Sequence, residues 1–219
     1  MVPMLTIVLT RHGLTDRSDP EQHLGQHVDV PLSEAGRGAA AALGTRLAAV
    51  SFDRVIASPL RRALDTARIA LPNATVETDP RLMEMDYGEW EGHTVAEIEA
   101  RWPGLRHHFE ADPASTTCPG GESGHDLASR VGSLIAELVA WGCSGGAPDR
   151  RVLLVAHSTL GRILLCRELG VPLVDYRRRF RQDWASLTVL RYMDRSSGAQ
   201  LLLANDVGHL RGLSGPTWD

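Results

Sequence analysis

The stretch RVLLVAHSTLGRILLCREL, residues 151–169, decides the fold class of this chain. Its first part, 151–156, is an uninterrupted apolar run, which is typical of a strand buried on both faces of a sheet. Its second part, 158–169, has helical spacing and runs up to Gly170, a residue that favours helix termination. A buried strand that leads directly into a helix is the repeating unit of a parallel α/β sheet.

The same strand-and-helix unit occurs twice in the first third of the chain. Apolar runs at 5–9 and 54–57 predict two more buried strands. The helices that follow them are expected over 33–50, capped by Ser33, and over 58–71, with Ser58 as the N-cap and Pro59 in the first helical position. Three such units predict a three-layer α/β/α sandwich with a largely parallel central sheet.

The remaining segments are expected to complete this sandwich as one domain over 1–219. Apolar runs at 186–193 and 199–205 flank the turn sequence DRSSG and favour a hairpin that extends the sheet. The stretch around 87–123 is rich in tryptophan, proline and glycine, and it predicts short helices and loops that form a lid-like insertion over one end of the sheet.

Composition excludes several classes of partner. The 219 residues carry a net charge of -4, so no basic surface for nucleic acid is expected. No apolar run approaches the roughly 20 residues of a membrane helix, and the N-terminus does not have the pattern of a signal peptide. The three cysteines match no zinc pattern and predict reduced thiols in a cytoplasmic protein. The oligomeric state stays open, with a homodimer as one alternative.

Basic and polar residues gather directly after the predicted strands. Arg11 and His12 follow the first strand, Arg62 lies on the first turn of the helix after the second, and His157 with Ser158 follows the third. In an open α/β sheet these positions share the rim where ligands bind. Arginine forks and helix amides suit a phosphate dianion, so we expect a phosphate site there.

A catalytic version of this site needs a nucleophile and an acid. A neutral imidazole is a competent nucleophile, and neighbouring cations keep it unprotonated, which favours His12. The segment RLMEMDYGEWEG, residues 81–92, offers the acid candidates Glu84, Asp86, Glu89 and Glu91. Glu84 is preferred over Asp86 as the general acid.

Five motifs carry a resemblance to a known family. LTRHG, SPLRRALDTA, LMEMDYGEWEG, GGES and VAHS occur here in the order and spacing of the histidine phosphatase superfamily, the phosphoglycerate mutase-like proteins, and the chain resembles that family from Leu9 to about His209. The resemblance implies that His12 becomes phosphorylated, that Glu84 donates the proton, and that Arg11, Arg62 and His157 bind the phosphate. It also implies an α/β fold of the phosphoglycerate mutase type.

The chain departs from the family pattern at three positions. Ser18 stands where the family commonly has an asparagine that reaches the phosphate, and Ser158 replaces a usual glycine. A glutamine common in the first helix is replaced by Gly38 or Ala39. Ser18 and Ser158 are therefore candidate phosphate contacts, and the substrate cannot be assigned by resemblance.

Other polar clusters have alternative interpretations. His23 and His27 have a spacing that occurs in metal sites, but Gly25 lies between them and no third ligand is evident, so loop histidines are favoured, one of them near the substrate. The basic run at 176–182 is typical of a solvated face, and an arginine within 177–181 that reaches a substrate carboxylate is the alternative.

The sequence thus predicts a metal-independent phosphomonoesterase without a cofactor, acting on a small phosphate ester of the sugar phosphate or phosphoglycerate type through a phosphohistidine. A phosphoglycerate mutase is the alternative with the same chemistry, and a phosphate-binding regulatory module is the alternative without turnover. The tryptophan- and asparagine-rich continuation that follows the R-H-G motif in family mutases does not follow it in this chain, which favours the phosphatase.

Overall fold

The computed structural model describes residues 3–19, 21–144, 148–194 and 198–212. Its centre is a six-stranded sheet in the order β3-β2-β4-β1-β5-β6. The strands are β1 (Leu5–Arg11), β2 (Arg54–Ala57), β3 (Val76–Thr78), β4 (Arg150–Ala156), β5 (Leu187–Tyr192) and β6 (Ala199–Asp206). Four of them, β3, β2, β4 and β1, pair in parallel, and β5 and β6 add an antiparallel edge. The predicted sandwich and hairpin are confirmed, although the tip of the hairpin, 195–197, lies outside the described residues.

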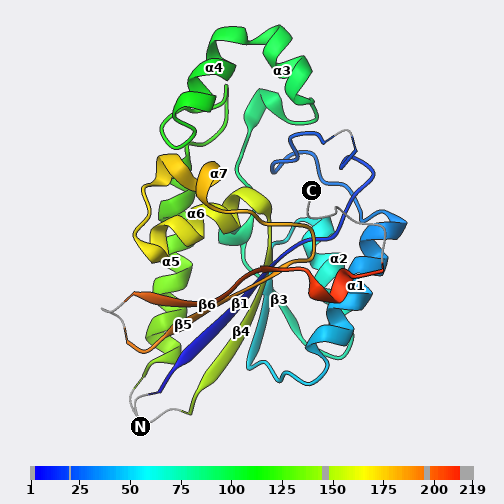
Figure 1. Cartoon of the computed structure of the whole chain (residues 1–219), viewed down its shortest axis with the longest axis vertical. Helices are drawn as coiled ribbons and strands as arrows, with labels where there is room; N and C mark the ends of the chain where they lie inside the picture. The colour runs from blue at the N-terminus through cyan, green and yellow to red at the C-terminus, as the bar shows by residue number, and fades with distance from the viewer. Residues whose placement is uncertain (1–2, 20, 145–147, 195–197, 213–219) are drawn as a thin grey trace.

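Helices cover both faces of the sheet (Figure 1). One face carries α1 (Glu34–Leu47) and α2 (Arg61–Ala70), and the other carries α5 (Gly124–Gly142) and α6 (Ser158–Leu169). Each face has its own buried cluster, with Leu43 and Val55 in the first, and Leu134, Ile163 and Trp90 in the second. The sheet interior is therefore sealed on both sides, and the site chemistry is confined to the strand ends.

Three short helices lie beyond one end of the sheet or beside it. α3 (Val95–Arg101) and α4 (Pro103–Ala111) extend away from the sheet at the top of Figure 1, and α7 (Tyr176–Arg179) follows α6. The short helices predicted within 87–123 are thus present. Four single turns of 3₁₀ helix complete the described structure, at Pro80–Leu82, Gly88–Trp90, Leu173–Asp175 and Gly208–Leu210.

Local signals explain several helix ends. The Ser33 hydroxyl accepts the Gly36 amide at 3.1 Å and starts α1, and Gly170 ends α6 in the left-handed conformation at φ 68°. Gly36 also allows close packing, because a Cβ there would lie 2.0 Å from the Leu14 carbonyl oxygen. α1 can therefore pack directly against the backbone that follows His12.

The predicted N-cap of α2 is wrong. α2 begins at Arg61 with Leu60 as its N-cap, and the Leu60 side chain has no capping group. Ser58 lies farther back along the chain, where its hydroxyl is 2.8 Å from Nε2 of His157 and 3.3 Å from the Leu60 amide. The Ser58 hydroxyl thus bonds to the amide of the observed N-cap residue and to His157, and the helix starts two residues later than predicted. α1 likewise ends at Leu47, before the predicted limit at 50.

Candidate active site

A cavity of about 170 Å³ opens where β1 and β4 end. Five of the seven predicted site residues line it: Arg11, His12, Ser18, Glu84 and Ser158. The other two, Arg62 and His157, do not line it and are 0% and 1% exposed. The ring of His157 nevertheless lies edge-on to that of His12, with centroids 5.1 Å apart, so the structure brings the two histidines together.

His12 is held as a neutral imidazole with a defined proton position. Its Nδ1 lies 2.7 Å from the carbonyl oxygen of Gly13, which can only accept, so Nδ1 carries the proton and Nε2 the lone pair. Burial lowers the pKa of His12 well below its usual value, and the charges of Arg62 and Arg11 lower it further. Nε2 is therefore an unprotonated nitrogen at neutral pH.

His157 is bonded through one of its two ring nitrogens in the described structure. Its Nε2 is 2.8 Å from the Ser58 hydroxyl, while its Nδ1 is buried without a hydrogen-bond partner among the described residues. Burial, then Arg62 and then His12 lower the pKa of His157 well below its usual value, so this ring is also neutral. If the Ser58 hydroxyl donates to Nε2, the ring proton lies on the unpartnered Nδ1.

Arg11 is held by contacts with residues both near and distant in the sequence. One guanidinium nitrogen donates to the Gln182 carbonyl at 2.9 Å, and another lies 3.3 Å from a carboxylate oxygen of Glu21. The guanidinium also stacks over the ring of Trp184, 4.3 Å from its centroid. These contacts orient Arg11 at the cavity wall.

Arg62 and Glu91 both form hydrogen bonds with the backbone of the loop 24–28. The Arg62 guanidinium donates to three carbonyl oxygens, those of Leu24, Gly25 and Val28. The Glu91 carboxylate accepts three backbone amides, those of Gln26, His27 and Val28. Opposite charges thus satisfy both the donors and the acceptors of the segment 24–28, which keeps this loop packed against Arg62.

Glu84 is oriented by backbone amides. Its Oε1 accepts the amides of Met85 at 2.9 Å and Leu160 at 3.0 Å, and its Oε2 accepts the Thr159 amide at 3.1 Å. Two of these donors belong to the first turn of α6, where the helix presents free amides. The carboxylate is buried, 6% exposed, and its position depends on the start of α6.

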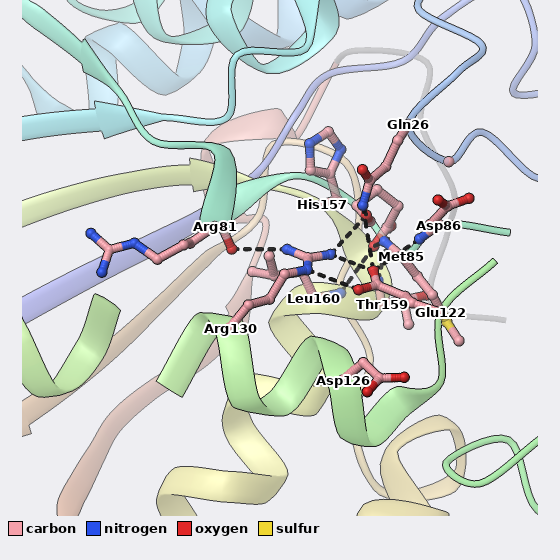
Figure 2. A network of polar contacts seen from close by, with 12 residues as sticks. Gln26, Arg81, Met85, Asp86, Glu122, Asp126, Arg130, His157, Thr159 and Leu160 are labelled. Atoms are coloured by element: carbon pink, nitrogen blue, oxygen red, sulfur yellow. Dashed lines mark hydrogen bonds and ion pairs between the residues drawn. The ribbon is translucent and has the colours of Figure 1, made fainter. Parts of the chain in front are cut away.

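The backbone around Glu84 is tied to α5 by Arg130. Arg130 donates to the carbonyl oxygens of Arg81 and Glu84, each at 2.9 Å. Figure 2 shows the contacts of Arg130 with Arg81 and with Glu122, and the ion pair with Glu122 has a distance of 2.6 Å. Gln26 adds a bond from its side-chain amide to the Glu84 carbonyl at 2.9 Å. This network links the acid candidate to three separate parts of the chain.

Asp86, the alternative acid, lies in a different environment. Its Oδ1 accepts the Gly88 amide at 2.8 Å, and its Oδ2 is 3.4 Å from His27. Asp86 does not line the cavity, whereas Glu84 does. The geometry therefore favours Glu84 over Asp86.

The two serines are both at the cavity, with different roles in the fold. The Ser18 hydroxyl accepts the Thr15 amide at 3.0 Å and is partly committed to its own loop. Ser158 is the first residue of α6.

The two histidines predicted to lie in a loop differ in their relation to the cavity. His23 lines the cavity, and burial together with the charges of Arg106 and Arg177 lowers its pKa to about 4. His27 is exposed and does not line the cavity.

One group of side chains among the described residues has the spacing of metal ligands. His27, Asp86 and Glu91 place one ligand atom each within 4.8 Å of one another. Both oxygens of Glu91 already accept backbone amides, and His27 pairs with Asp86. The group is explained by these contacts, and it does not line the cavity.

Several lining residues were not predicted from the sequence. They include Arg162 on α6, Tyr176 on α7 and Trp184 in the segment that follows. Arg162 had a signal, because it is four residues after Ser158 and shares its helix face. Arg177 also lines the cavity and lies in the run 177–181, where an arginine was the alternative prediction. Trp184 had no local signal.

The chain is similar to known phosphatases over most of its length. The model of the histidine phosphatase superfamily (branch 1) matches residues 7–206. A glucosyl-3-phosphoglycerate phosphatase of Mycobacterium tuberculosis is 40% identical over 178 residues, 78% of each chain. The solved native structure of the mycobacterial glucosyl-3-phosphoglycerate phosphatase is 37% identical with a TM-score of 0.82, over 92% of this chain and 99% of that one.

Similarity to mutases is lower. A probable phosphoglycerate mutase of Salmonella choleraesuis is 30% identical over 212 residues, 94% of this chain and 95% of its own. The comparisons therefore support the phosphatase prediction over the mutase alternative, and they confirm the resemblance found in the motifs. The match of the family model over nearly the whole chain shows that this protein belongs to branch 1 of the histidine phosphatase superfamily.

Proposed function

We propose that this protein hydrolyses a small phosphomonoester of the phosphoglycerate or sugar phosphate type, with His12 as the nucleophile and Glu84 as the acid. The observation that carries the proposal is the pairing of an unprotonated His12 Nε2 with a buried Glu84 carboxyl in one cavity. The name of the mycobacterial relative, a glucosyl-3-phosphoglycerate phosphatase, supports an ester of this class.

In the first step, His12 Nε2 forms a bond to phosphorus as the ester P–O bond breaks. The leaving oxygen takes the electron pair of that bond and a proton from Glu84. Arg11, the unpartnered Nε–H of Arg62 and the ring N–H of His157 stabilise the charge on the three equatorial oxygens. Ser18 and Ser158 are further hydroxyl donors at the cavity.

In the second step, water attacks the phosphohistidine. Glu84, now a carboxylate, takes a proton from the water as the P–N bond breaks, which returns His12 to its neutral form and releases inorganic phosphate. The positive charge in both steps comes from arginines and from N–H donors, so we expect the reaction to need no metal and no cofactor.

A panel of phosphomonoesters, with released phosphate as the readout, tests this function. Hydrolysis of several esters that persists in EDTA supports it. Loss of activity in EDTA with recovery in Mg²⁺ contradicts the metal-free mechanism. No hydrolysis of any ester, including an aryl phosphate, favours the alternative of a phosphate-binding regulatory module.

The mutase alternative has its own test. Incubation with 3-phosphoglycerate, with and without the bisphosphorylated primer, separates isomerisation from phosphate release. A phosphatase releases phosphate and forms no isomer, because water reaches the phosphohistidine. Isomerisation much faster than phosphate release would assign the protein to the mutases.

The wider assignments belong to the same proposal. We take 1–219 as one domain with a lid-like insertion around 87–123, and the presence of Val95 and Phe109 among the cavity-lining residues supports this lid. Cys118, Cys143 and Cys166 are free thiols, which fits a cytoplasmic protein. No helix among the described residues is long and apolar enough to cross a membrane. We expect no nucleic-acid partner, and light scattering would decide whether two copies form a homodimer.

A further inference from the structure

The cavity holds more positive charge than its own acidic groups balance. Its basic residues are Arg11, Arg17, Arg162 and Arg177, and its acidic residues are Glu21 and Glu84. Glu21 pairs with Arg11, and Glu84 accepts three backbone amides. Neither carboxylate has a contact with Arg162 or Arg177 among the bonds of the described structure. A phosphate bound at His12 would contact Arg11, and Arg162 and Arg177 would still have no acidic partner within the cavity.

Arg162 has no partner within the part of the chain that the structure describes. It lies four residues after Ser158 on α6, and its Nε is buried with no hydrogen bond. Arg167, on the same helix, forms an ion pair with Glu168. A half-buried guanidinium that faces a cavity and lacks an acidic partner is unfavourable unless the ligand supplies the anion.

Arg177 lies on α7, which packs against α6. Its guanidinium stacks over the Phe109 ring at 5.6 Å from the centroid, and it has a long contact of 3.5 Å with Glu110. Its side chain is one-third exposed and reaches the cavity. Arg162, Tyr176 and Arg177 line the same cavity, so the two arginines belong to one wall.

We propose that Arg162, assisted by Arg177, forms a second anion subsite that binds a carboxylate of the substrate. This inference rests on the proposed function and narrows it to phosphate esters that also carry a carboxylate, the phosphoglycerate type, over neutral sugar phosphates. A single unpartnered guanidinium matches a monoanionic carboxylate, which it binds through two parallel N–H bonds. A second phosphate is the other anion that this chemistry accepts, so the test includes it.

The experiment compares two substrates that differ in one group. 3-Phosphoglycerate has a carboxylate where glycerol 3-phosphate has a hydroxymethyl group. We expect the wild-type kcat/KM to favour 3-phosphoglycerate by about tenfold or more, because a site built to bind a charged group rejects the analogue that lacks it. Arg162→Gln should bring this ratio close to one, and Arg177→Gln should lower it several-fold. The ratio cancels any general loss of active protein.

Arg178→Gln is the matched control. Arg178 is on the same short helix, its side chain is 68% exposed, it contacts Asp175 at 3.8 Å, and it does not line the cavity. This variant should keep the wild-type ratio. A wild-type ratio near one, or an unchanged ratio in Arg162→Gln, overturns the subsite while the phosphatase function stands.

A binding measurement keeps the two proposals separate. Calorimetric titration of His12→Ala with 3-phosphoglycerate and with glycerol 3-phosphate measures the preference without turnover. If no ester is hydrolysed, the proposed function fails, and the binding ratio still decides the subsite. The same titration with fructose 1,6-bisphosphate and fructose 6-phosphate tests for a second phosphate. The carboxylate assignment is overturned in favour of a second phosphate if the protein prefers the bisphosphate, Arg162→Gln removes that preference, and 3-phosphoglycerate is not preferred.

Discussion

The inner end of the cavity, around His12 and Glu84, differs from its outer wall, around Trp184 and Arg177, in how the side chains are held. At the inner end, backbone groups orient the reactive atoms: the Gly13 carbonyl fixes His12, and amides of α6 fix Glu84. At the outer wall, Trp184 contacts Arg11 through its ring, and Arg177 is one-third exposed with one long ion pair. The groups proposed for the reaction are thus held by strand ends and a helix start, whereas the groups proposed for recognition are side chains from segments that can change without altering the sheet.

The largest expected effect is at the inner end. His12→Ala should lower kcat by at least about a thousandfold, because it removes the covalent route. The measurement is phosphate release from an aryl phosphate, with circular dichroism to verify the fold. His27→Ala, an exposed histidine outside the cavity, is the control and should keep wild-type kcat. Activity above about a thousandth of wild type in His12→Ala would move the nucleophile elsewhere.

The acid should show an effect that depends on the leaving group. Glu84→Gln should lower kcat for an alkyl phosphate by about a hundredfold or more, since alkoxides need protonation, and should lower it far less for nitrophenyl phosphate. Asp86→Asn serves as the comparison, because Asp86 is nearby in sequence but does not line the cavity. Equal losses on both substrates would remove Glu84 from this role.

Arg62 should control the pH dependence of the nucleophile. His12 must be neutral to attack, and the positive charge of Arg62 lowers its pKa by disfavouring the imidazolium. Removing that charge in Arg62→Gln raises the pKa of His12, so the acid limb of kcat/KM should move to higher pH. The profile is measured with nitrophenyl phosphate. Arg61→Gln is the control, because Arg61 is an exposed neighbour paired with Asp65, and it should leave the acid limb unchanged. A shift of the acid limb to lower pH in Arg62→Gln would contradict this electrostatic account.

The smallest effect is expected at the contact between Trp184 of the outer wall and Arg11. Trp184→Ala removes the ring under Arg11, a contact worth about 0.5–2 kcal/mol, so KM should rise by several-fold with little change in kcat. Trp184→Phe should recover part of the loss. Trp141→Ala removes a similar stacking contact with Arg150 away from the cavity and should leave KM unchanged. A large drop in kcat with constant KM would mean that Trp184 acts on the reaction and not on binding.

The sequence by itself determined the elements that depend on short-range patterns. The unalternating run 151–156 and the helix up to Gly170 appear as predicted, because burial on both faces and a left-handed terminus leave local signatures. Arg11, His12 and Glu84 were predicted to lie together from strand ends and motif spacing, and all three line the same cavity. α5 was not among the predicted helices, although Ser123, the last residue of GGES, forms a capping box with Asp126 at its start.

Only the tertiary structure decided which polar groups meet across long separations. Ser58 has the local pattern of an N-cap, but its hydroxyl pairs with His157, 99 residues away. Glu84 and Asp86 differ in environment because α6 brings its amides to Glu84 alone. Arg11 meets Trp184 because β5 pairs beside β1. Periodicity and capping act over a few residues, whereas these contacts depend on how the strands are ordered in the sheet, which no local pattern encodes.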